Sequence, residues 1–472
     1  MVTSRRLIQP KVCWDAVHGV RHLSTTQLVR SPPHPSSASV SSSSTSAVSS
    51  SAATSKKSPL SVLPTGVLLR SFFINAVSSR PYLLSPSLYI LSKISKSQSG
   101  VILNVDRNPL LRWIMKNTFY KQFCAGESGR ETRSTMDLLQ NLGFRGTILT
   151  YAKETVFDFH SNSSFGQGVS NSAKEGENCP SIEAWRTGNM ETVSLLQEGD
   201  QLALKLSGAG PRVTNAFAEG QVPPQQFLDA LEEICSNCNA RKAQILVDAE
   251  SQQFQWGIMR VTIDLMRKYN TSDKVLIFNT YQAYLKSTPS TLRTHMQTAL
   301  DDGFTLGVKV VRGAYMASDP RGLIHDTKEN TDDAYNAIAQ GFLKQQYEGF
   351  GVDGRAFPAS NLFLASHNKF SLVEAYKTHM SQKRQGLPTV PVGFAQLHGM
   401  SDDVSFELLK MKASDAGLET PDIYKCSTWG TLKECMAYLM RRAAENRDAV
   451  GRTVDEYAAL KAELGRRMGL SA

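Results

Sequence analysis

The chain has 472 residues, of which 41% are hydrophobic and 20% are charged, and its formal net charge is +9. This length permits one large domain with appendages or two domains. The positive charge lies near the N-terminus, because residues 1–105 hold eleven Lys or Arg and a single acid, whereas the remaining residues carry a net charge of −1. The body therefore lacks the basic surface of a nucleic-acid-binding domain, and we expect no nucleic-acid partner.

Residues 1–60 have the composition of a targeting leader. They contain four arginines before residue 31, almost no acid, and a run rich in Ser, Thr and Pro. Mitochondrial transit peptides have this composition, whereas a secretory signal needs an apolar core that this stretch lacks. We expect a transit peptide followed by a disordered spacer, and hence a mitochondrial protein; a disordered cytosolic tail is the alternative.

Residues 61–126 are expected to form an N-terminal arm. Between residues 60 and 94 the arm is rich in Leu, Ile, Val and Phe, but Arg70, Arg80 and Pro86 interrupt it. No run reaches the ~20 apolar residues that cross a bilayer. The arm is therefore expected to lie on a membrane surface or to pack on the body as helices, and the sequence does not decide between them.

The cysteines do not predict a disulfide framework or a metal site. There are seven, an odd number. Cys235 and Cys238 form a CxxC at the end of a predicted helix, without the second ligand pair of a zinc site. We interpret them as structural or free thiols and expect no bound metal.

From residue 127 to 450, helical patterns alternate with short apolar stretches. The stretches expected as strands are 147–151, 202–207, 244–248, 275–281, 306–311, 361–366, 390–396 and, more weakly, 422–425. Continuously apolar strands are typical of parallel sheets covered on both sides. The pattern predicts a (β/α)8 TIM-type barrel with an N-terminal helical arm, and a doubly wound sheet is the alternative. We expect residues 157–180 to form a polar loop and residues 451–472 a C-terminal helix.

Polar side chains gather at the C-terminal ends of these strands. In a barrel these ends surround one mouth, where active sites occur. Each residue alone could be a helix cap or a loop contact, but the whole ring favours an active site. A strand-end lysine could also be the nucleophile of a Schiff-base aldolase, so that enzyme class stays open. The residues are Lys205, Asp248, Gln282, Lys309, Arg312, Ser366, His367, Asn368, Gln396 and His398.

The helix predicted over residues 430–446 carries Tyr438, Arg441, Arg442 and Glu445 on one face, at spacings of three, four and seven. The spacing alone favours a solvated face with Glu–Arg pairs. The alternative is a carboxylate clamp, in which the two guanidinium groups hold a substrate carboxylate and Glu445 fixes one of them.

Four motifs follow one another along the chain: LGVKVVRGAY at 306–315, SHN at 366–368, QLHGM at 396–400 and YLMRRAAEN at 438–446. Together they resemble the mitochondrial proline dehydrogenase (proline oxidase) family, and the resemblance extends over about residues 127–450. It implies a (β/α)8 barrel that binds FAD non-covalently and oxidises L-proline to Δ1-pyrroline-5-carboxylate by hydride transfer to flavin N5. It also implies that electrons pass to ubiquinone at the matrix side of the mitochondrial inner membrane, where the protein would be peripheral.

The resemblance also implies a role for each matching residue. Arg441 and Arg442 would bind the proline carboxylate, and Glu445 would pair with one of them. The substrate would lie among Lys205, its acidic neighbour Asp248, the pocket wall Tyr438, and Leu397 above the ring. The positions that would line the flavin, where cations offset the pyrophosphate charge, are Gln282, Lys309, Arg312, Gly313, Ser366, His367 and Asn368.

One position departs from the family pattern. Many relatives have Tyr-x-Pro-x-Gly shortly before the last helix, and the tyrosine touches the substrate. Aligned on Gly430, this chain has Cys426 at that position, and Tyr424 lies two residues earlier. The preference between L-proline and 4-hydroxyproline is therefore left open.

Overall fold

The computed structural model describes residues 58–96, 104–151, 155–158, 163–166, 178–272, 274–415, 417–448 and 450–470. All of them belong to the unit formed by residues 57–472. The predicted leader, apart from its last three residues, lies outside the described residues.

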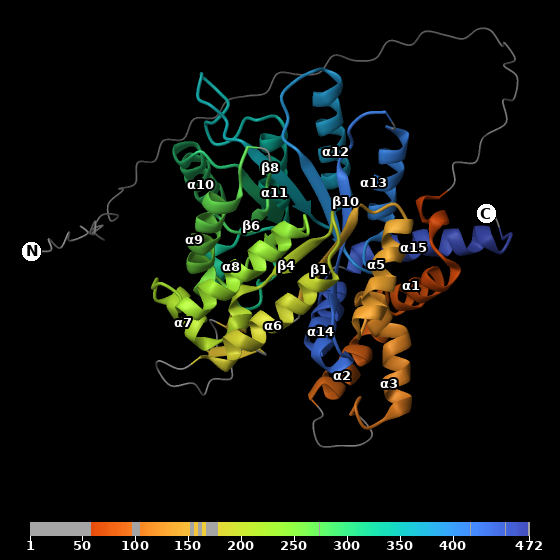
Figure 1. The fold of residues 1–472 in the computed structure, drawn as a ribbon. Coiled ribbons are helices and arrows are strands. Elements are labelled where there is room, and N and C mark those ends of the chain that lie inside the picture. The colour runs from red at the N-terminus through yellow and green to blue at the C-terminus, as the bar shows by residue number, and fades with distance from the viewer. Residues whose placement is uncertain are drawn as a thin grey trace, which may run out of the picture. The chain divides into compact units, whose positions relative to one another are not determined.

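Eight parallel strands close into a barrel, in the order β1-β10-β9-β8-β7-β6-β5-β4 (Figure 1). This closure confirms the predicted barrel and excludes the doubly wound sheet. The strands are β1 (Gly146–Tyr151), β4 (Gln201–Leu204), β5 (Gln244–Val247), β6 (Ile277–Gln282), β7 (Leu306–Val311), β8 (Ser360–Ala365), β9 (Val392–Leu397) and β10 (Asp422–Trp429).

Helices cover the outside of the barrel between successive strands (Figure 1). Several begin with a side-chain cap that satisfies a free backbone N–H group: Ser128 accepts a hydrogen bond from the Glu131 N–H, and Thr327 from the Asn330 N–H. The helices are α5 (Gly129–Asn141), α6 (Pro180–Leu195), α7 (Pro211–Ala218), α8 (Gln225–Ala240), α9 (Gln252–Tyr269), α10 (Thr288–Asp302), α11 (Lys328–Leu343), α12 (Lys369–Arg384) and α13 (Asp402–Ser414).

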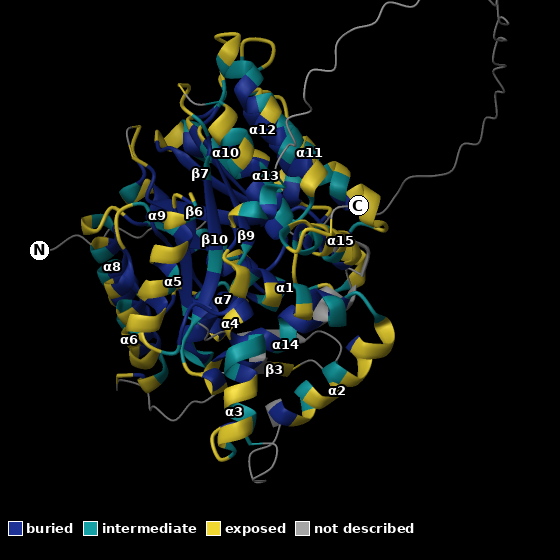
Figure 2. Cartoon of the chain, turned by 90° about the vertical axis from the view of Figure 1, so that its right-hand side faces the viewer, coloured by how far each residue is buried: buried dark blue, intermediate teal, exposed yellow. Residues whose placement is uncertain are grey.

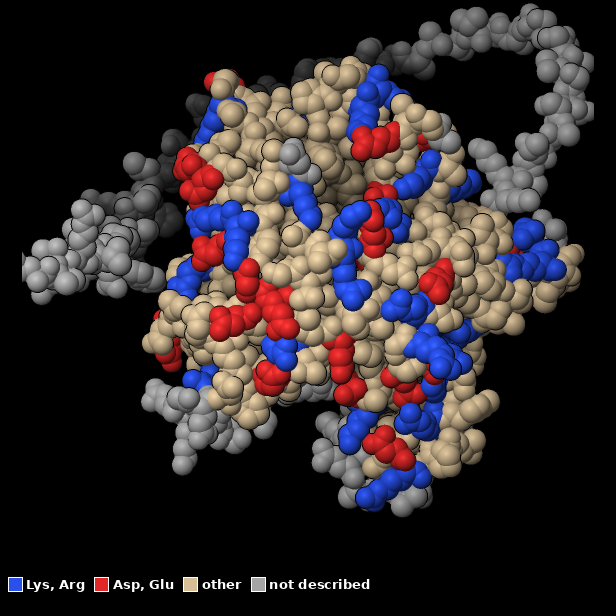
Figure 3. Space-filling model, in the orientation of Figure 1, with Lys and Arg blue, Asp and Glu red and all other residues tan. Residues whose placement is uncertain are grey.

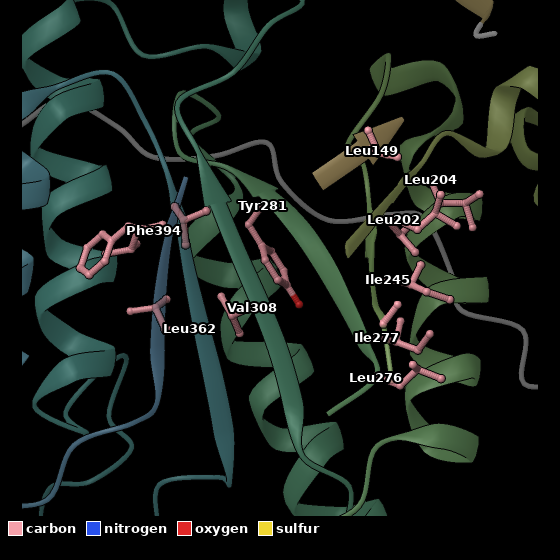
Figure 4. Packing of buried hydrophobic residues seen from close by; sticks show 14 of the residues in the cluster. Leu149, Leu202, Leu204, Ile245, Leu276, Ile277, Tyr281, Val308, Leu362 and Phe394 are labelled. Atoms are coloured by element: carbon pink, nitrogen blue, oxygen red, sulfur yellow. The ribbon is translucent and has the colours of Figure 1, made fainter. Parts of the chain in front are cut away.

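Strand alternation separates two apolar layers, and both are buried (Figure 2). Outward side chains such as Leu202, Ile245 and Val308 pack beneath the helices (Figure 4). Inward side chains such as Leu246 and Ala395 fill the barrel. Two residues beyond these inward positions, the same alternation directs Asp248 and Leu397 toward the mouth.

Two sequence predictions differ from the structure. Part of the stretch expected as a loop pairs as an antiparallel hairpin, β2 (Thr155–Asp158) with β3 (Ser163–Gly166). Backbone hydrogen bonds hold such a pair, and a polar composition does not prevent them. The weak eighth strand is the longest of the barrel, because residues 426–429 continue to pair with β1.

The arm packs on the last two helices, α14 (Leu432–Asp448) and α15 (Val450–Arg467). Its elements are η1 (Pro59–Val62), α1 (Thr65–Ser78), α2 (Pro81–Lys96), α3 (Pro109–Met115), η2 (Lys116–Tyr120) and α4 (Lys121–Phe123). Helix α1 lies against α15, and α2 lies against α14. A buried cluster joins Ile94, Tyr120 and Phe123 of the arm to Met436 and Leu439 of α14. Among the described residues, no helix is long and apolar enough to cross a membrane.

Candidate active site

Three charged side chains meet at the barrel mouth. Asp248 follows β5 and bridges two lysines: its carboxylate lies 3.1 Å from Lys205 Nζ and 2.7 Å from Lys309 Nζ. The three side chains are only 10–16% exposed. The structure thus brings together three residues that the strand-end pattern predicts as neighbours.

The two lysines determine the charge state of Asp248. Burial alone would raise the pKa of this carboxyl group, but the ammonium groups of Lys309 and Lys205 outweigh it and lower the pKa to about 2. Asp248 is therefore ionised at neutral pH and forms ion pairs with both cations.

Neighbouring side chains hold the strand end that carries Lys205. The buried Trp185 donates its indole N–H to the Lys205 carbonyl oxygen at 2.8 Å. The buried Glu250 accepts a hydrogen bond from the Ser207 N–H at 3.0 Å. Sequence reasoning predicts neither residue: Trp185 lies on a helix distant in sequence, although the position of Glu250 just beyond Asp248 is a weak signal.

Helix α14 presents the predicted arginine face toward the protein interior. Tyr438 and Arg442 are only 6% and 7% exposed, and the Arg442 guanidinium lies 4.8 Å from the centre of the Tyr438 ring. Arg441 is half-buried. The solvated-face interpretation is therefore wrong for Tyr438 and Arg442. The Glu445 side chain lies outside the described residues.

Cys426 connects this helix with the strand ends. Burial raises the pKa of its thiol to about 11, and the charges of Lys309, Asp248, Arg442 and Lys205 all lie close enough to act on it. The thiol is consequently neutral. Charges of α14 and of the lysine–aspartate cluster therefore act on the same small side chain, where a tyrosine would leave less room.

A second cluster is built around Arg312, just beyond β7. Its guanidinium contacts Asp332 at 2.6 Å, donates to Ser371 Oγ at 2.9 Å and to Ser366, and lies 4.3 Å from the centre of the Tyr335 ring. These contacts fix the orientation of a half-buried cation.

Two residues beside this cluster have defined structural roles: Asn368 is a helix cap, and Gly313 has a positive φ angle. Asn368 caps α12 by accepting a hydrogen bond from the Ser371 N–H at 3.1 Å. Gly313 has a φ of +142°, and a Cβ there would lie 2.4 Å from the Tyr284 ring. Only glycine therefore lets the backbone lie against that ring.

The remaining predicted site residues occupy three strand ends. Gln282 is buried and donates to the Glu250 carbonyl oxygen at 3.4 Å. His367 is half-buried in the turn between β8 and α12. Leu397 ends β9 and packs against the cluster that contains Tyr438.

Two strand-end residues do not join the mouth, contrary to the sequence prediction. Gln396 points outward and accepts a hydrogen bond from Ser405 at 2.8 Å. His398 contacts Ser427 at 3.1 Å and lines a cavity of about 480 Å³ between the arm and α5. Burial lowers the pKa of His398 to about 4, so this imidazole is neutral. The odd–even alternation of β9 explains both positions.

Among the residues that the structure describes, no group of three or more His, Cys, Asp or Glu side chains is placed to hold a metal ion. Cys235 and Cys238 are free thiols buried in α8. Burial raises the pKa of Cys238 to about 12, so it is unreactive at neutral pH.

Comparison with known proteins identifies the family of the chain. The profile of the family described as proline dehydrogenase matches residues 132–455. The chain is 29% identical over 458 residues to the probable mitochondrial proline dehydrogenase of Schizosaccharomyces pombe, covering 85% of this chain and 88% of that protein. It is 30% identical over 411 residues to the hydroxyproline dehydrogenase of Xenopus laevis, covering 80% of this chain and 84% of that protein.

A solved structure shares the fold. The crystal structure of proline utilization A (PutA) from Bdellovibrio bacteriovorus, inactivated by N-propargylglycine, superposes with a TM-score of 0.60 at 16% identity. The match covers 84% of this chain and 40% of the longer PutA chain. The match of the family profile over more than half of the sequence shows that the chain belongs to the proline dehydrogenase family.

Proposed function

We propose that this protein catalyses the FAD-dependent oxidation of L-proline to Δ1-pyrroline-5-carboxylate and passes the electrons to ubiquinone. The observation that carries the proposal is the buried ion-pair cluster of Lys205, Asp248 and Lys309 at the barrel mouth. The buried Arg442 of α14 and this cluster both act electrostatically on Cys426. Anaerobic titration with L-proline, followed through the flavin absorbance, tests the proposal.

The charges suit a zwitterionic amino acid. Arg441 and Arg442 offer two guanidinium groups to the substrate carboxylate, and guanidinium–carboxylate pairs fix orientation as well as charge. Leu397 and Tyr438 supply apolar surface for the ring. Such positioning of a reacting C–H bond accounts for much of the rate enhancement when the redox chemistry belongs to a cofactor.

The substrate amine must lose a proton before the imine is formed. Asp248 is a poor base for this step, because its pKa of about 2 lies far below neutral pH. Both neighbouring lysines are paired with it. We infer that the proton passes to solvent and that the cluster positions the substrate.

The mouth also fits FAD, which when bound supplies the hydride acceptor. Arg312 is a fixed cation suited to the pyrophosphate, and the Gly313 backbone lies where a Cβ would strike Tyr284. Lys309 places a second cation at the mouth, where it would stabilise negative charge on the reduced ring. Gln282, Ser366, His367 and Asn368 would complete the lining.

The aldolase alternative has less support. A Schiff base forms from a neutral amine, and in this structure Lys205 and Lys309 both form ion pairs with Asp248. An oxidoreductase of the proline dehydrogenase family is the function that the geometry supports best.

A second candidate substrate is 4-hydroxyproline. Cys426 is small and lies among the site charges, and relatives of this chain include the hydroxyproline dehydrogenase of Xenopus laevis. We expect Cys426→Tyr to raise the ratio of kcat/KM for L-proline over 4-hydroxyproline by about tenfold, because the added ring excludes the hydroxyl group. Cys426→Ala, which adds no bulk, should leave the ratio within about two-fold. Equal ratios in the Tyr variant and the wild type would contradict the assignment of Cys426 to the substrate pocket.

We further propose that the protein is imported into mitochondria and associates peripherally with the matrix side of the inner membrane. The arginine-rich, acid-poor leader supports import, and the Schizosaccharomyces pombe relative is named as mitochondrial. A reporter protein fused to residues 1–60 should enter mitochondria. A fusion that stays in the cytosol or enters the secretory route would refute the proposed targeting.

A further inference from the structure

Two helices of the arm expose large apolar side chains on their outward faces. Figures 1 and 2 show α2 and α3 together at the lower end of the molecule, with exposed residues along both. Tyr82 and Tyr89 of α2 are 71% and 63% exposed, and Trp113 of α3 is 64% exposed. We call this set the arm surface; its residues are Tyr82, Leu83, Tyr89, Ile90, Leu110, Trp113 and Ile114.

The spacing of these residues forms continuous stripes. On α2, Tyr89 follows Tyr82 by seven positions, which is two helical turns, and Ile90 is the next residue. The three side chains therefore lie on one side of the helix. The opposite face of α2 is also apolar: Leu84 is buried, and Leu91 packs against the cluster shared with α14. A helix that is apolar on both faces needs a second apolar partner beyond the protein body.

The charge of the arm restricts what this partner can be. Residues 58–126 contain eight Lys or Arg and one acid, a net charge of +7, whereas residues 127–472 carry −4. Arg112 and Lys116 are paired with Glu127. Lys93 and Arg107, in contrast, have no acidic partner in the part of the chain that the structure describes. Figure 3 shows Lys and Arg side chains at this lower end, together with some Asp and Glu side chains and with uncharged surface beside them.

We propose that the arm surface docks on a bilayer containing anionic phospholipids. Exposed Trp and Tyr beside aliphatic residues suit the boundary between headgroups and acyl chains, and the surrounding cations suit anionic headgroups. A second copy of this chain fits less well, because two arms of +7 would repel each other.

This proposal names the surface for the membrane association proposed above and adds a consequence. The arm packs on α14, the helix that carries Arg441 and Arg442. Docking through the arm would therefore hold that helix close to the bilayer, where a lipid-soluble electron acceptor is concentrated. This consequence rests on the proposed function, whereas the lipid contact itself does not.

Vesicle co-sedimentation of the full chain tests the proposal. The probes are phosphatidylcholine vesicles with and without cardiolipin. We expect binding to the cardiolipin vesicles, and a Tyr89→Ser/Trp113→Ser double variant should bind at least about tenfold more weakly, since it removes two side chains that enter the interface. The matched control is Trp256→Ser on α9, because Trp256 is 63% exposed but lies outside the arm; its binding should equal that of the wild type.

Three outcomes would overturn the proposal. The first is that the wild type binds neither kind of vesicle. The second is that Trp256→Ser weakens vesicle binding as much as the double variant does. The third is that the double variant binds as tightly as the wild type, which would assign the contact to the basic leader. A concentration-dependent dimer that the double variant abolishes would instead identify a second copy as the partner. The double variant should oxidise L-proline at the wild-type rate when a soluble dye is the electron acceptor. If the proposed function is wrong, the wild type itself will fail to reduce the dye with L-proline, and this result is independent of vesicle binding.

Discussion

Replacing Arg442 with Met should raise the KM for L-proline roughly ten- to a hundred-fold. Hydrogen bonds to charged groups contribute about 1.5–3 kcal/mol each, and about 1.4 kcal/mol corresponds to a factor of ten. Met retains much of the packing of the buried stem, so flavin content and Tm should stay close to those of the wild type. Arg441→Met should act in the same direction. We expect a smaller effect from Glu445→Gln, because the family resemblance pairs Glu445 with one of these arginines without giving it a contact to the substrate.

The matched control is Lys433→Met on the same helix. The Lys433 side chain is 73% exposed and lies 3.5 Å from Asp106 at the protein surface. Its removal should leave KM within about two-fold and stability within about 1 kcal/mol. If the KM values of the two arginine variants matched that of the control, α14 would not hold the substrate carboxylate.

Replacing Asp248 with Asn should lower the free energy of unfolding by about 2–3 kcal/mol. Removing one partner from a fully buried ion pair costs about 3–5 kcal/mol. The expected loss is smaller because the three side chains remain 10–16% exposed. Asp264→Asn is a suitable control, since the Asp264 side chain is 63% exposed and pairs with Arg267 at 2.6 Å; this variant should lose less than about 1 kcal/mol. Urea denaturation of both variants measures the difference.

The same carboxylate predicts a dependence of stability on pH. Its pKa falls from an ordinary 3.8 to about 2 in the folded chain. A lowered pKa contributes stability above pH 3.8, and this contribution is lost as the pH falls toward 2. One pKa unit corresponds to about 1.4 kcal/mol, so the contribution is about 2 kcal/mol. In the Asn variant, the free energy of unfolding should therefore fall less between about pH 4 and pH 2 than in the wild type. If both proteins lost the same stability over this range, Asp248 would not have a lowered pKa in the folded chain.

The barrel could be predicted from sequence because its strands are continuously apolar. The full length of β10 could not, since its last four residues include Ser427 and Thr428, which are polar and yet buried. Ser427 contacts His398 at 3.1 Å, and this partner is distant in sequence, so the local pattern looks like a polar loop. The hairpin of β2 and β3 was missed for a similar reason: its backbone pairing leaves little trace in composition.

Part of the site was also predictable. Alternation along parallel strands placed Lys205, Asp248 and Lys309 at one mouth. The sequence did not show that Asp248 bridges both lysines, because that depends on distances across four neighbouring strands, β4 to β7. The burial of Arg442 was also hidden, since it depends on the arm and the barrel mouth enclosing α14.

The most direct test of the central claim is the absorbance of the purified protein during anaerobic mixing with L-proline. A bound flavin absorbs at ~450 nm in its oxidised form. We predict that the protein carries this band and that L-proline bleaches it. A colourless protein, or a flavin band that neither L-proline nor 4-hydroxyproline reduces, would contradict the proposed function.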